Sequence, residues 1–287
     1  MIDVPEGFLA MPRWWREGAE WLAGLPRAVE RQCLRWGLTV AGEVAFGSNA
    51  IVVPVVRGGV EFVLRMTPPG PEVAEQVRAL RWWDGRGMVL LYDADLENGA
   101  MLLERLSTPL ASRPVSEAVA VLGQLMRRLA VPAPDDVLST AEIVVDRASA
   151  FEREWEDLGR PFDRGILRAA LDVAPALGET TSDLAVNADL HSDQVLAGTR
   201  ENWLTVDPVL YRGDIEFDLA RILWTRLDEM TDIESHFDTV VAGAALEDRD
   251  RARDWVVFRT VDYWLWGLKN GLTEDPVRCA RLVNAFL

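Results

Sequence analysis

The chain has 287 residues, a formal net charge of −16, and a hydrophobic content of 49%. This length and composition exclude a disordered chain and predict a globular protein of one large domain or two lobes. The acidic balance disfavours nucleic acid as a partner, because phosphate backbones require basic surface, and it suits a cationic small molecule.

Scarce residue types exclude several kinds of site. Lys269 is the single lysine and has no glycine-rich loop around it, so the phosphate-binding motif GxxxxGK[ST] is absent. The two histidines, His191 and His236, are too few for a multi-histidine zinc site. Cys33 and Cys279 lie far apart in the sequence; buried free thiols are expected, with a disulfide as the alternative.

Neither a membrane segment nor a secretory signal is expected. No apolar run reaches the ~20 residues that a membrane-spanning helix needs. The N-terminus lacks a basic segment followed by an apolar run. We therefore expect a cytoplasmic protein that does not contact a membrane.

The first hundred residues change from helical to strand-like patterning. Apolar residues at helical spacing predict two helices between about residues 13 and 36, separated by a turn at Gly24 and Pro26. A period of two and many β-branched residues then predict antiparallel strands, and glycine-containing turns connect them. The predicted strands cover residues 38–46, 50–56 and 60–66, followed by a helix over 72–83 and strands over 88–92 and 100–103.

The rest of the chain is mainly helical in pattern. Between its helices, a short strand over 184–186 leads into a polar loop, and a second apolar run over 203–206 follows. The predicted helices cover residues 116–129, 140–158, 162–177, 215–230, 233–241, 249–266 and 276–286.

Polar side chains follow both of these short β segments. Asp189 comes directly after the first, Gln194 lies five residues further on, and Asp207 ends the second, before Pro208. Loops at strand ends are where rigid scaffolds place functional groups. Phosphoryl transfer from a nucleotide needs such a set: one carboxylate to orient a hydroxyl, and oxygen ligands to hold magnesium.

The order and spacing of three segments resemble the aminoglycoside phosphotransferase family, in particular its streptomycin and hydroxyurea kinases. That family's motif reads HGDLHxxNVL, then IDP, then GDxxxDL; this chain has NADLHSDQVL at 187–196, VDP at 206–208 and GDIEFDL at 213–219. The resemblance implies that Asp189 is the catalytic base and that Gln194 and Asp207 are magnesium ligands. Asn187 replaces the first histidine of the motif, and Gln194 replaces its asparagine.

The resemblance also implies the fold. It is an α+β, bilobal protein-kinase-like fold, with a small N-terminal antiparallel β-sheet lobe and a larger, mostly helical C-terminal lobe. The expected domains are residues 1–106, which bind the nucleotide, and residues 107–287, which carry the catalytic loop and the acceptor site. The segment of Glu104 and Leu106 would join the lobes, and its backbone would receive the adenine.

In the N-terminal lobe, Arg65 stands where the related kinases carry a phosphate-binding lysine. Arginine keeps the charge and binds phosphate with different geometry; an exposed strand arginine is the alternative. Glu75 is the expected ion-pair partner, although Gln76 occupies the aligned position and Glu75 is equally compatible with a solvated helix. Ser48, in the turn before the second strand, is a further candidate to contact the nucleotide.

Other polar residues of the motif are expected to support the loop. His191 would hold it by hydrogen bonds, Asp214 would cap the following helix, and Asp218 would brace the catalytic loop. Four acids are candidates to face a cationic substrate, with Trp264 or Trp266 as a stacking wall; an exposed helical face and a tryptophan core are the alternatives. These acids are Asp193, Asp228, Glu229 and Asp262.

The resemblance predicts an enzyme that phosphorylates a hydroxyl of a streptomycin-like aminoglycoside with ATP and Mg²⁺, and so confers antibiotic resistance. A kinase of another small metabolite, such as a sugar, an amino sugar or a hydroxyurea-like compound, is the first alternative. The departures at Arg65, Gln76, Asn187 and Gln194 allow a second alternative, a catalytically weak nucleotide-binding module.

Overall fold

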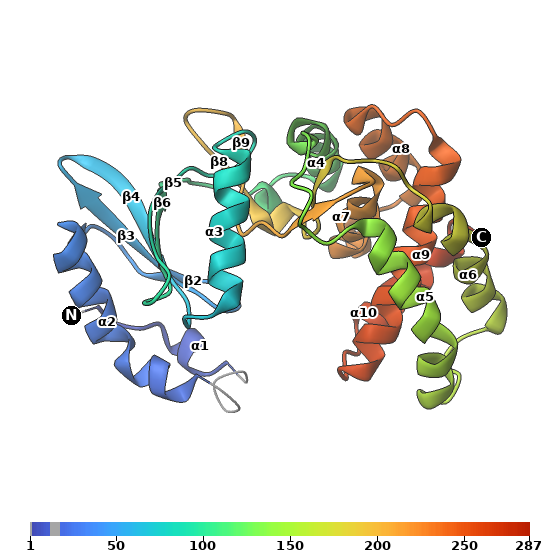
Figure 1. Cartoon of the computed structure of the whole chain (residues 1–287), viewed down its shortest axis with the longest axis horizontal. Helices are drawn as coiled ribbons and strands as arrows, with labels where there is room; N and C mark the ends of the chain where they lie inside the picture. Colours follow the sequence, from blue (N-terminus) through green and yellow to red (C-terminus); the bar gives the residue numbers. More distant parts are fainter. Residues whose placement is uncertain (1, 12–17) are drawn as a thin grey trace. The chain divides into compact units, whose positions relative to one another are not determined.

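The structure is a computed structural model that describes residues 2–11 and 18–287 (Figure 1). The chain forms two compact units: the N-terminal unit, Met1–Ser107 with Gly198–Arg200, and the C-terminal unit, Thr108–Ala197 with Glu201–Leu287. The predicted boundary after residue 106 falls one residue before this division. The assignment of residues 198–200 to the N-terminal unit has no counterpart in the sequence pattern.

The N-terminal unit is built on an antiparallel sheet with the order β1-β3-β4-β6-β5, in which β2 also pairs with β3. The strands are β1 (Thr39–Val40), β2 (Ala45–Phe46), β3 (Ile51–Arg57), β4 (Val60–Met66), β5 (Leu91–Asp95) and β6 (Ala100–Glu104). The prediction of one strand over 38–46 is wrong, because β1 and β2 pair separately with β3. Ala41 donates to the Pro54 carbonyl at 2.8 Å, but Pro54 has no N–H to return the bond, and the ladder stops there. The strand predicted over 88–92 begins later, at Leu91.

Helices lie on both faces of this sheet, α2 on one and α3 on the other (Figure 1). They are α1 (Glu6–Leu9), α2 (Ala19–Trp36) and α3 (Pro71–Trp83). The prediction of two helices before residue 36 is wrong for the described part, because α2 continues through Gly24 and Pro26; residues 13–17 lie outside the described residues. Burial of Leu25, Val29 and Cys33 in the core that also contains Leu64 holds the helix together across the proline.

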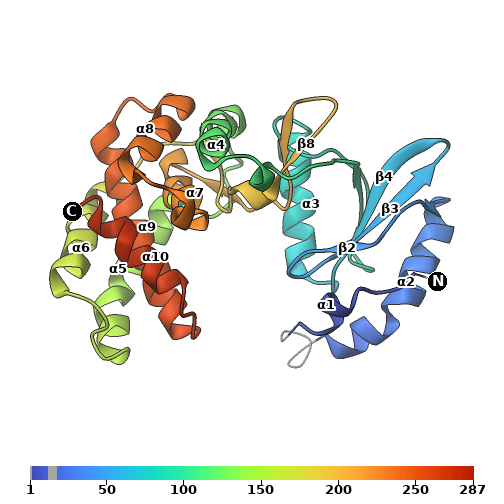
Figure 2. The ribbon, with the colours of Figure 1, turned by 180° about the vertical axis from the view of Figure 1, so that it is seen from behind.

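The C-terminal unit is mostly helical, and its core surrounds α9, with α10 packed beside it (Figure 2). Its helices are α4 (Val115–Leu129), α5 (Thr140–Asp157), α6 (Arg164–Gly178), α7 (Leu219–Thr225), α8 (Ile233–Ala244), α9 (Arg249–Lys269) and α10 (Asp275–Asn284). One continuous helix over 215–230 was expected and is wrong: 3₁₀ turns at Ile215–Asp218 and Leu227–Glu229 flank the short α7. The α+β class, with an antiparallel sheet and many helices, is confirmed.

Two short antiparallel pairs carry the polar loops of the C-terminal unit. β7 (Ala185–Asn187) pairs with β10 (Leu210–Arg212), and β8 (Val195–Ala197) pairs with β9 (Trp203–Thr205). Both cysteines are free and buried, as expected. Within residues 2–11 and 18–287, no helix combines the length and the apolar content needed to cross a membrane.

Candidate functional site

The loop that follows β7 is anchored at its start by Asn187. This residue is 2% exposed, and its side-chain oxygen accepts a hydrogen bond from the Val209 backbone at 3.1 Å. The Ala188 N–H donates to the Val209 carbonyl at 3.0 Å, so the loop is tied to the segment before β10 from both residues. Asn187 therefore fills a structural position where the related motif has histidine.

Asp189 stands next in the loop, and both of its carboxylate oxygens have neighbours. Its Oδ1 accepts a hydrogen bond from Arg221 Nε at 2.7 Å, and its Oδ2 lies 3.5 Å from Gln194 Nε2. The side chain is 32% exposed, so it is held in place and still open to solvent. Arg221, on α7, is a residue that the sequence reasoning missed, because an arginine on a short helix carries no motif of its own.

Asp218, a buried residue in the 3₁₀ turn before α7, supports the same loop. It is 2% exposed, and the Leu190 backbone N–H acts on its carboxyl, which agrees with the expected bracing role. Burial raises the pKa of Asp218 well above its ordinary value, although the Leu190 N–H and the Arg259 charge oppose the shift. The carboxyl thus sits in a dry position directly under the loop.

The expectation that Asp214 caps a helix is wrong, because its side chain makes no capping hydrogen bond. Its Oδ2 accepts hydrogen bonds from Arg251 Nε at 3.1 Å and from Trp255 Nε1 at 2.9 Å. Its Oδ1 accepts a short hydrogen bond from Thr180. Asp214 therefore ties α9 to the segment around β10 from a buried position.

Gln194 and Asp207 lie at the same end of the β8–β9 pair. The Val206 N–H donates to the Gln194 carbonyl at 2.8 Å, which extends the ladder by one step, and Asp207 follows directly. Asp207 has a φ of +49°, a left-handed conformation that is rare outside glycine and gathers at functional sites.

A carboxylate and an amide oxygen are the hard donors that Mg²⁺ prefers, so the pair fits this ion. Within the described parts of the chain, no cluster of three or more His, Cys, Asp or Glu side chains is arranged to hold a metal. Because Mg²⁺ is commonly held by one or two carboxylates together with phosphates and water, a larger protein cluster is not required.

His191 lies between two carboxylates of the loop. Its Nε2 is 3.9 Å from Asp189 Oδ2, and its Nδ1 is 3.4 Å from Asp193 Oδ2. The nearby His191 ring lowers the pKa of Asp193 against the effect of burial, with further help from the charges of Arg226 and Arg221. His191 is buried, whereas the Asp193 side chain is 60% exposed. Of the four acids predicted to face a substrate, Asp193 is the one that lies in the catalytic loop.

The other three predicted acceptor acids are each paired with arginine. Asp228 accepts hydrogen bonds from Arg278 and Arg281, and Glu229 pairs with Arg226. Their charges are therefore partly balanced before any cationic ligand arrives, and their role toward an acceptor stays a prediction.

Asp262 differs from these two because it is only 7% exposed. Its two oxygens accept hydrogen bonds from Arg147 Nε at 2.6 Å and Arg259 Nη1 at 2.7 Å. With both arginines it lines a cavity of about 360 Å³ that Trp266 also borders. Any ligand there would meet an acid that is already neutralised.

The two tryptophans proposed as a stacking wall differ in exposure. Trp264 is 7% exposed and packs on Phe162 with ring centroids 4.4 Å apart, so it belongs to the core. Trp266 is 49% exposed and stacks on Tyr263, which in turn stacks on Trp224. Only Trp266 keeps a free ring edge for a ligand.

In the N-terminal unit, Arg65 is buried against α3 and the turn after β2. It is 3% exposed and donates to Gln76 Oε1 at 3.1 Å and Asn49 Oδ1 at 3.3 Å. The alternative of an exposed strand arginine is therefore wrong. Gln76, at the aligned position, bonds to Arg65, while Glu75 is exposed and its pairing stays a prediction.

The turn that carries Ser48 is fixed at its next residue, since Asn49 bonds to Arg65. Ser48 itself is exposed. Asn49 was missed by the sequence reasoning; the only signal was its place in a Gly-Ser-Asn turn. The contact of Ser48 with a nucleotide stays a prediction.

Glu104 is held by two partners within the N-terminal unit. Its N–H donates to the Leu90 carbonyl at 2.9 Å, so this N–H is not open to an adenine base. Its carboxylate accepts hydrogen bonds from the Leu90 N–H at 3.2 Å and from Arg200 at 3.1 Å. Arg200 also donates to the carbonyls of Gly85 and Met88. Base recognition by the backbone of Leu106 stays a prediction.

The chain is similar to known antibiotic resistance kinases. Residues 35–271 match the family of aminoglycoside/hydroxyurea antibiotic resistance kinases. The chain is 39% identical to a streptomycin 6-kinase of Streptomyces griseus, over 95% of this chain and 93% of the relative. It is 37% identical to a hydroxyurea phosphotransferase of Kitasatospora aureofaciens, over 94% and 81% of the two chains.

Solved structures support the fold independently. A crystal structure of a thermostable mutant of aminoglycoside phosphotransferase APH(4)-Ia, in a ternary complex with ADP and hygromycin B, superposes with a TM-score of 0.61. It covers 89% of this chain and 97% of its own, at 17% sequence identity. This likeness confirms the predicted protein-kinase-like fold.

Proposed function

The chain belongs to the family of aminoglycoside/hydroxyurea antibiotic resistance kinases, and on that premise we propose that it phosphorylates a hydroxyl of a streptomycin-like aminoglycoside. The enzyme is a phosphotransferase that acts on a hydroxyl group. We propose ATP as donor and Mg²⁺ as its companion ion. The observation that carries this proposal is the placement of Asp189, fixed by Arg221 and close to Gln194, with Asp207 at the same end of the β8–β9 pair.

Each residue has a defined task in this proposal. Asp189 accepts the proton of the attacking hydroxyl and orients it, and positioning does most of the work in such a reaction. Gln194 and Asp207 would hold Mg²⁺, which neutralises phosphate charge when bound. Arg65 contributes the positive charge toward the phosphates in the N-terminal unit, where its guanidinium is oriented by Gln76 and Asn49.

The test is Mg²⁺-dependent release of ADP from ATP against a panel containing streptomycin, hygromycin B, amino sugars and hydroxyurea. We expect turnover with streptomycin. Turnover with hydroxyurea alone would favour the second candidate, which the 37% identical hydroxyurea phosphotransferase supports. Nucleotide binding without turnover on any acceptor would favour a nucleotide-binding module and contradict the proposal.

Asp189→Asn identifies the base in the same assay. We expect kcat to fall by about 10³-fold, because the variant keeps the shape of the side chain and loses its proton acceptor. Binding of ATP, measured by calorimetry, should stay nearly unchanged. A variant that retained full activity would show that Asp189 is not the base.

A further inference from the structure

Arg200 comes late in the sequence and completes the N-terminal unit. The chain leaves the C-terminal unit after Ala197, at the end of β8, and returns to it at Glu201, before β9. The residues between them, Gly198–Arg200, belong to the N-terminal unit. There Arg200 bonds to Glu104, which lies 96 residues earlier in the chain. The N-terminal unit therefore receives one of its charged contacts from the turn between β8 and β9.

The Arg200 guanidinium joins two segments of the N-terminal unit. Its Nη1 donates to the Gly85 carbonyl at 2.6 Å, and its Nη2 donates to the Met88 carbonyl at 2.9 Å. Nη2 also donates to Glu104 Oε2 at 3.1 Å. Because the guanidinium holds its donors in a rigid planar fork, one group sets the end of β6 against the turn after α3.

The turn after α3 is shaped for this contact. Asp84 and Gly85 both have a positive φ, of +43° and +79°. A Cβ atom on Gly85 would lie 2.6 Å from Leu90 Cδ2 and 3.4 Å from Arg200 Cζ, so conformation and space both favour glycine there. A cation at this place also interacts favourably with the negative end of the helix dipole.

Glu104 has Arg200 as its cationic partner. The Glu104 side chain is 11% exposed, and its carboxylate also accepts a hydrogen bond from the Leu90 N–H at 3.2 Å. Removing one member of a nearly buried ion pair leaves an uncompensated charge that is drawn toward water. Loss of Arg200 would therefore displace Glu104 and the chain that follows it.

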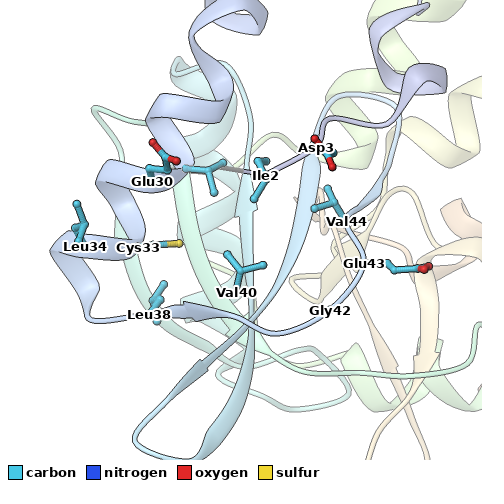
Figure 3. A pocket seen from close by; sticks show the side chains of 11 residues that line it. Ile2, Asp3, Glu30, Cys33, Leu34, Leu38, Val40, Gly42, Glu43 and Val44 are labelled. Carbon is cyan, nitrogen blue, oxygen red and sulfur yellow. The ribbon is translucent and has the colours of Figure 1, made fainter.

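The helix whose end Arg200 holds is also the helix that orients Arg65. On β4, Leu64 is buried in the core that α2 covers, whereas the next residue, Arg65, bonds to Gln76 on α3. The α2 side of the sheet is mainly apolar and carries the hollow of about 690 Å³ that Figure 3 shows. The polar contacts that concern a nucleotide thus belong to α3 and to the segment 104–106, and Arg200 connects these two.

We infer that Arg200 is a positioning residue for ATP and holds the segment 104–106 in the arrangement that receives the adenine. This inference rests on the proposed function, because it takes ATP as the phosphate donor. Arg200 acts through Glu104 and not on the reacting atoms. Without it, the segment would adopt the binding arrangement for a smaller part of the time, and the apparent affinity for ATP would fall by the same factor.

The first experiment compares ATP with tripolyphosphate, which lacks the adenosine. Binding of ATP to the full chain is measured by calorimetry, and binding of tripolyphosphate by its displacement of ATP. In Arg200→Ala, we expect the Kd for ATP to rise about tenfold, as for a segment that is competent about one-tenth of the time. Tripolyphosphate binding should stay unchanged, because buried Val73, Val77 and Leu80 still hold α3. Equal weakening of both ligands would overturn the role toward the adenine.

Matched variants separate this role from a general loss of an arginine. Arg35→Ala removes an arginine of the same unit whose side chain is 63% exposed and pairs with Asp95, and it should leave ATP binding unchanged. Arg200→Lys keeps the charge without the fork and should lose part of the affinity. This milder variant also serves if Arg200→Ala fails to fold. Equal ATP binding by Arg200→Lys and the natural chain would overturn the inference.

A double-mutant cycle with Glu104→Gln tests whether Arg200 acts through Glu104. Residues that act as one pair show strongly non-additive effects. Arg200→Ala combined with Glu104→Gln should therefore bind ATP about as well as Arg200→Ala alone, whereas losses that multiply would overturn the route through Glu104. A natural chain that bound no ATP would contradict the proposed function as well. ATP binding that is equal in the natural chain and Arg200→Ala would overturn this inference alone.

Discussion

At the scale of single residues, the position of the Asp189 carboxylate is set by two neighbouring side chains. Arg221 Nε lies 2.7 Å from one oxygen, and Gln194 Nε2 lies 3.5 Å from the other. The Arg221 guanidinium also lies over the Trp224 ring at 5.9 Å. One arginine thus connects the proposed base to the aromatic core of the C-terminal unit, which fits a positioning role for Arg221.

Arg221→Ala tests this positioning role. We expect kcat to fall by about 10- to 100-fold, because a misplaced reacting group loses that much, while the KM for ATP stays nearly constant. Arg221→Lys should recover part of the loss, since lysine keeps the charge without the fixed geometry. Arg249→Ala removes an exposed arginine that pairs with Asp238 and serves as the control. Equal effects of Arg221→Ala and Arg249→Ala on kcat would contradict the role.

At the scale of elements, the catalytic loop rests on the 3₁₀ turn that precedes α7. Asp218, in this turn, is 2% exposed, and the Leu190 N–H acts on its carboxyl. The folded state favours the protonated carboxyl, since burial raises the pKa of Asp218. This group therefore stabilises the fold most at low pH, and its contribution decreases as the pH rises above about 4 toward the raised pKa.

Asp218→Asn should change this pH dependence. Asparagine retains a side-chain oxygen in the same place and has no carboxyl proton to lose. The free energy of unfolding of the variant, relative to the natural chain, should therefore increase between about pH 5 and about pH 8, by about 1.4 kcal/mol for each pKa unit within that window. Urea unfolding at both pH values measures it. A relative stability that is the same at both would show that Asp218 does not titrate in this range.

Elements with strong periodicity were predictable, and those decided by tertiary contacts were not. The sequence pattern placed β4 and α9 within a few residues, because repeated apolar positions set both. It misplaced the turn at Pro26, since burial of α2 overrides a local helix breaker.

The candidate site also contains residues that the sequence indicates and residues that only the structure reveals. The candidates Asp189, Gln194 and Asp207 came from motifs shared with a kinase family, and their roles stay predictions. Arg221 and Asn49 could not be identified in this way, because their roles arise from hydrogen bonds between segments far apart in the sequence.

At the scale of the whole molecule, a net charge of −16 coexists with extensive local pairing of acids and arginines. Asp228, Glu229 and Asp262 all have arginine partners. Attraction of a cationic acceptor would therefore come from the summed field more than from a few free acids, and a summed field is sensitive to salt.

Salt titration tests this long-range attraction. Between about 0.05 and about 0.3 M salt, kcat/KM for a cationic aminoglycoside should fall several-fold, because screening slows its steered encounter with the acidic protein. The value for hydroxyurea, which is neutral, should hardly change. Equal salt dependence for both acceptors would show that the field of the protein does not select between them.

The N-terminal unit is not one continuous stretch of the chain, because Gly198–Arg200 also belong to it. A fragment that ended at codon 107 would lack Arg200, the donor to the Gly85 and Met88 carbonyls and to Glu104. A chimaera of two relatives made with a single crossover would therefore take residues 198–200 from one parent and the Gly85 and Met88 carbonyls from the other. Inheritance of the N-terminal unit as an intact module requires a second exchange around codons 198–200, and chimaera libraries built with both exchanges should yield more folded proteins.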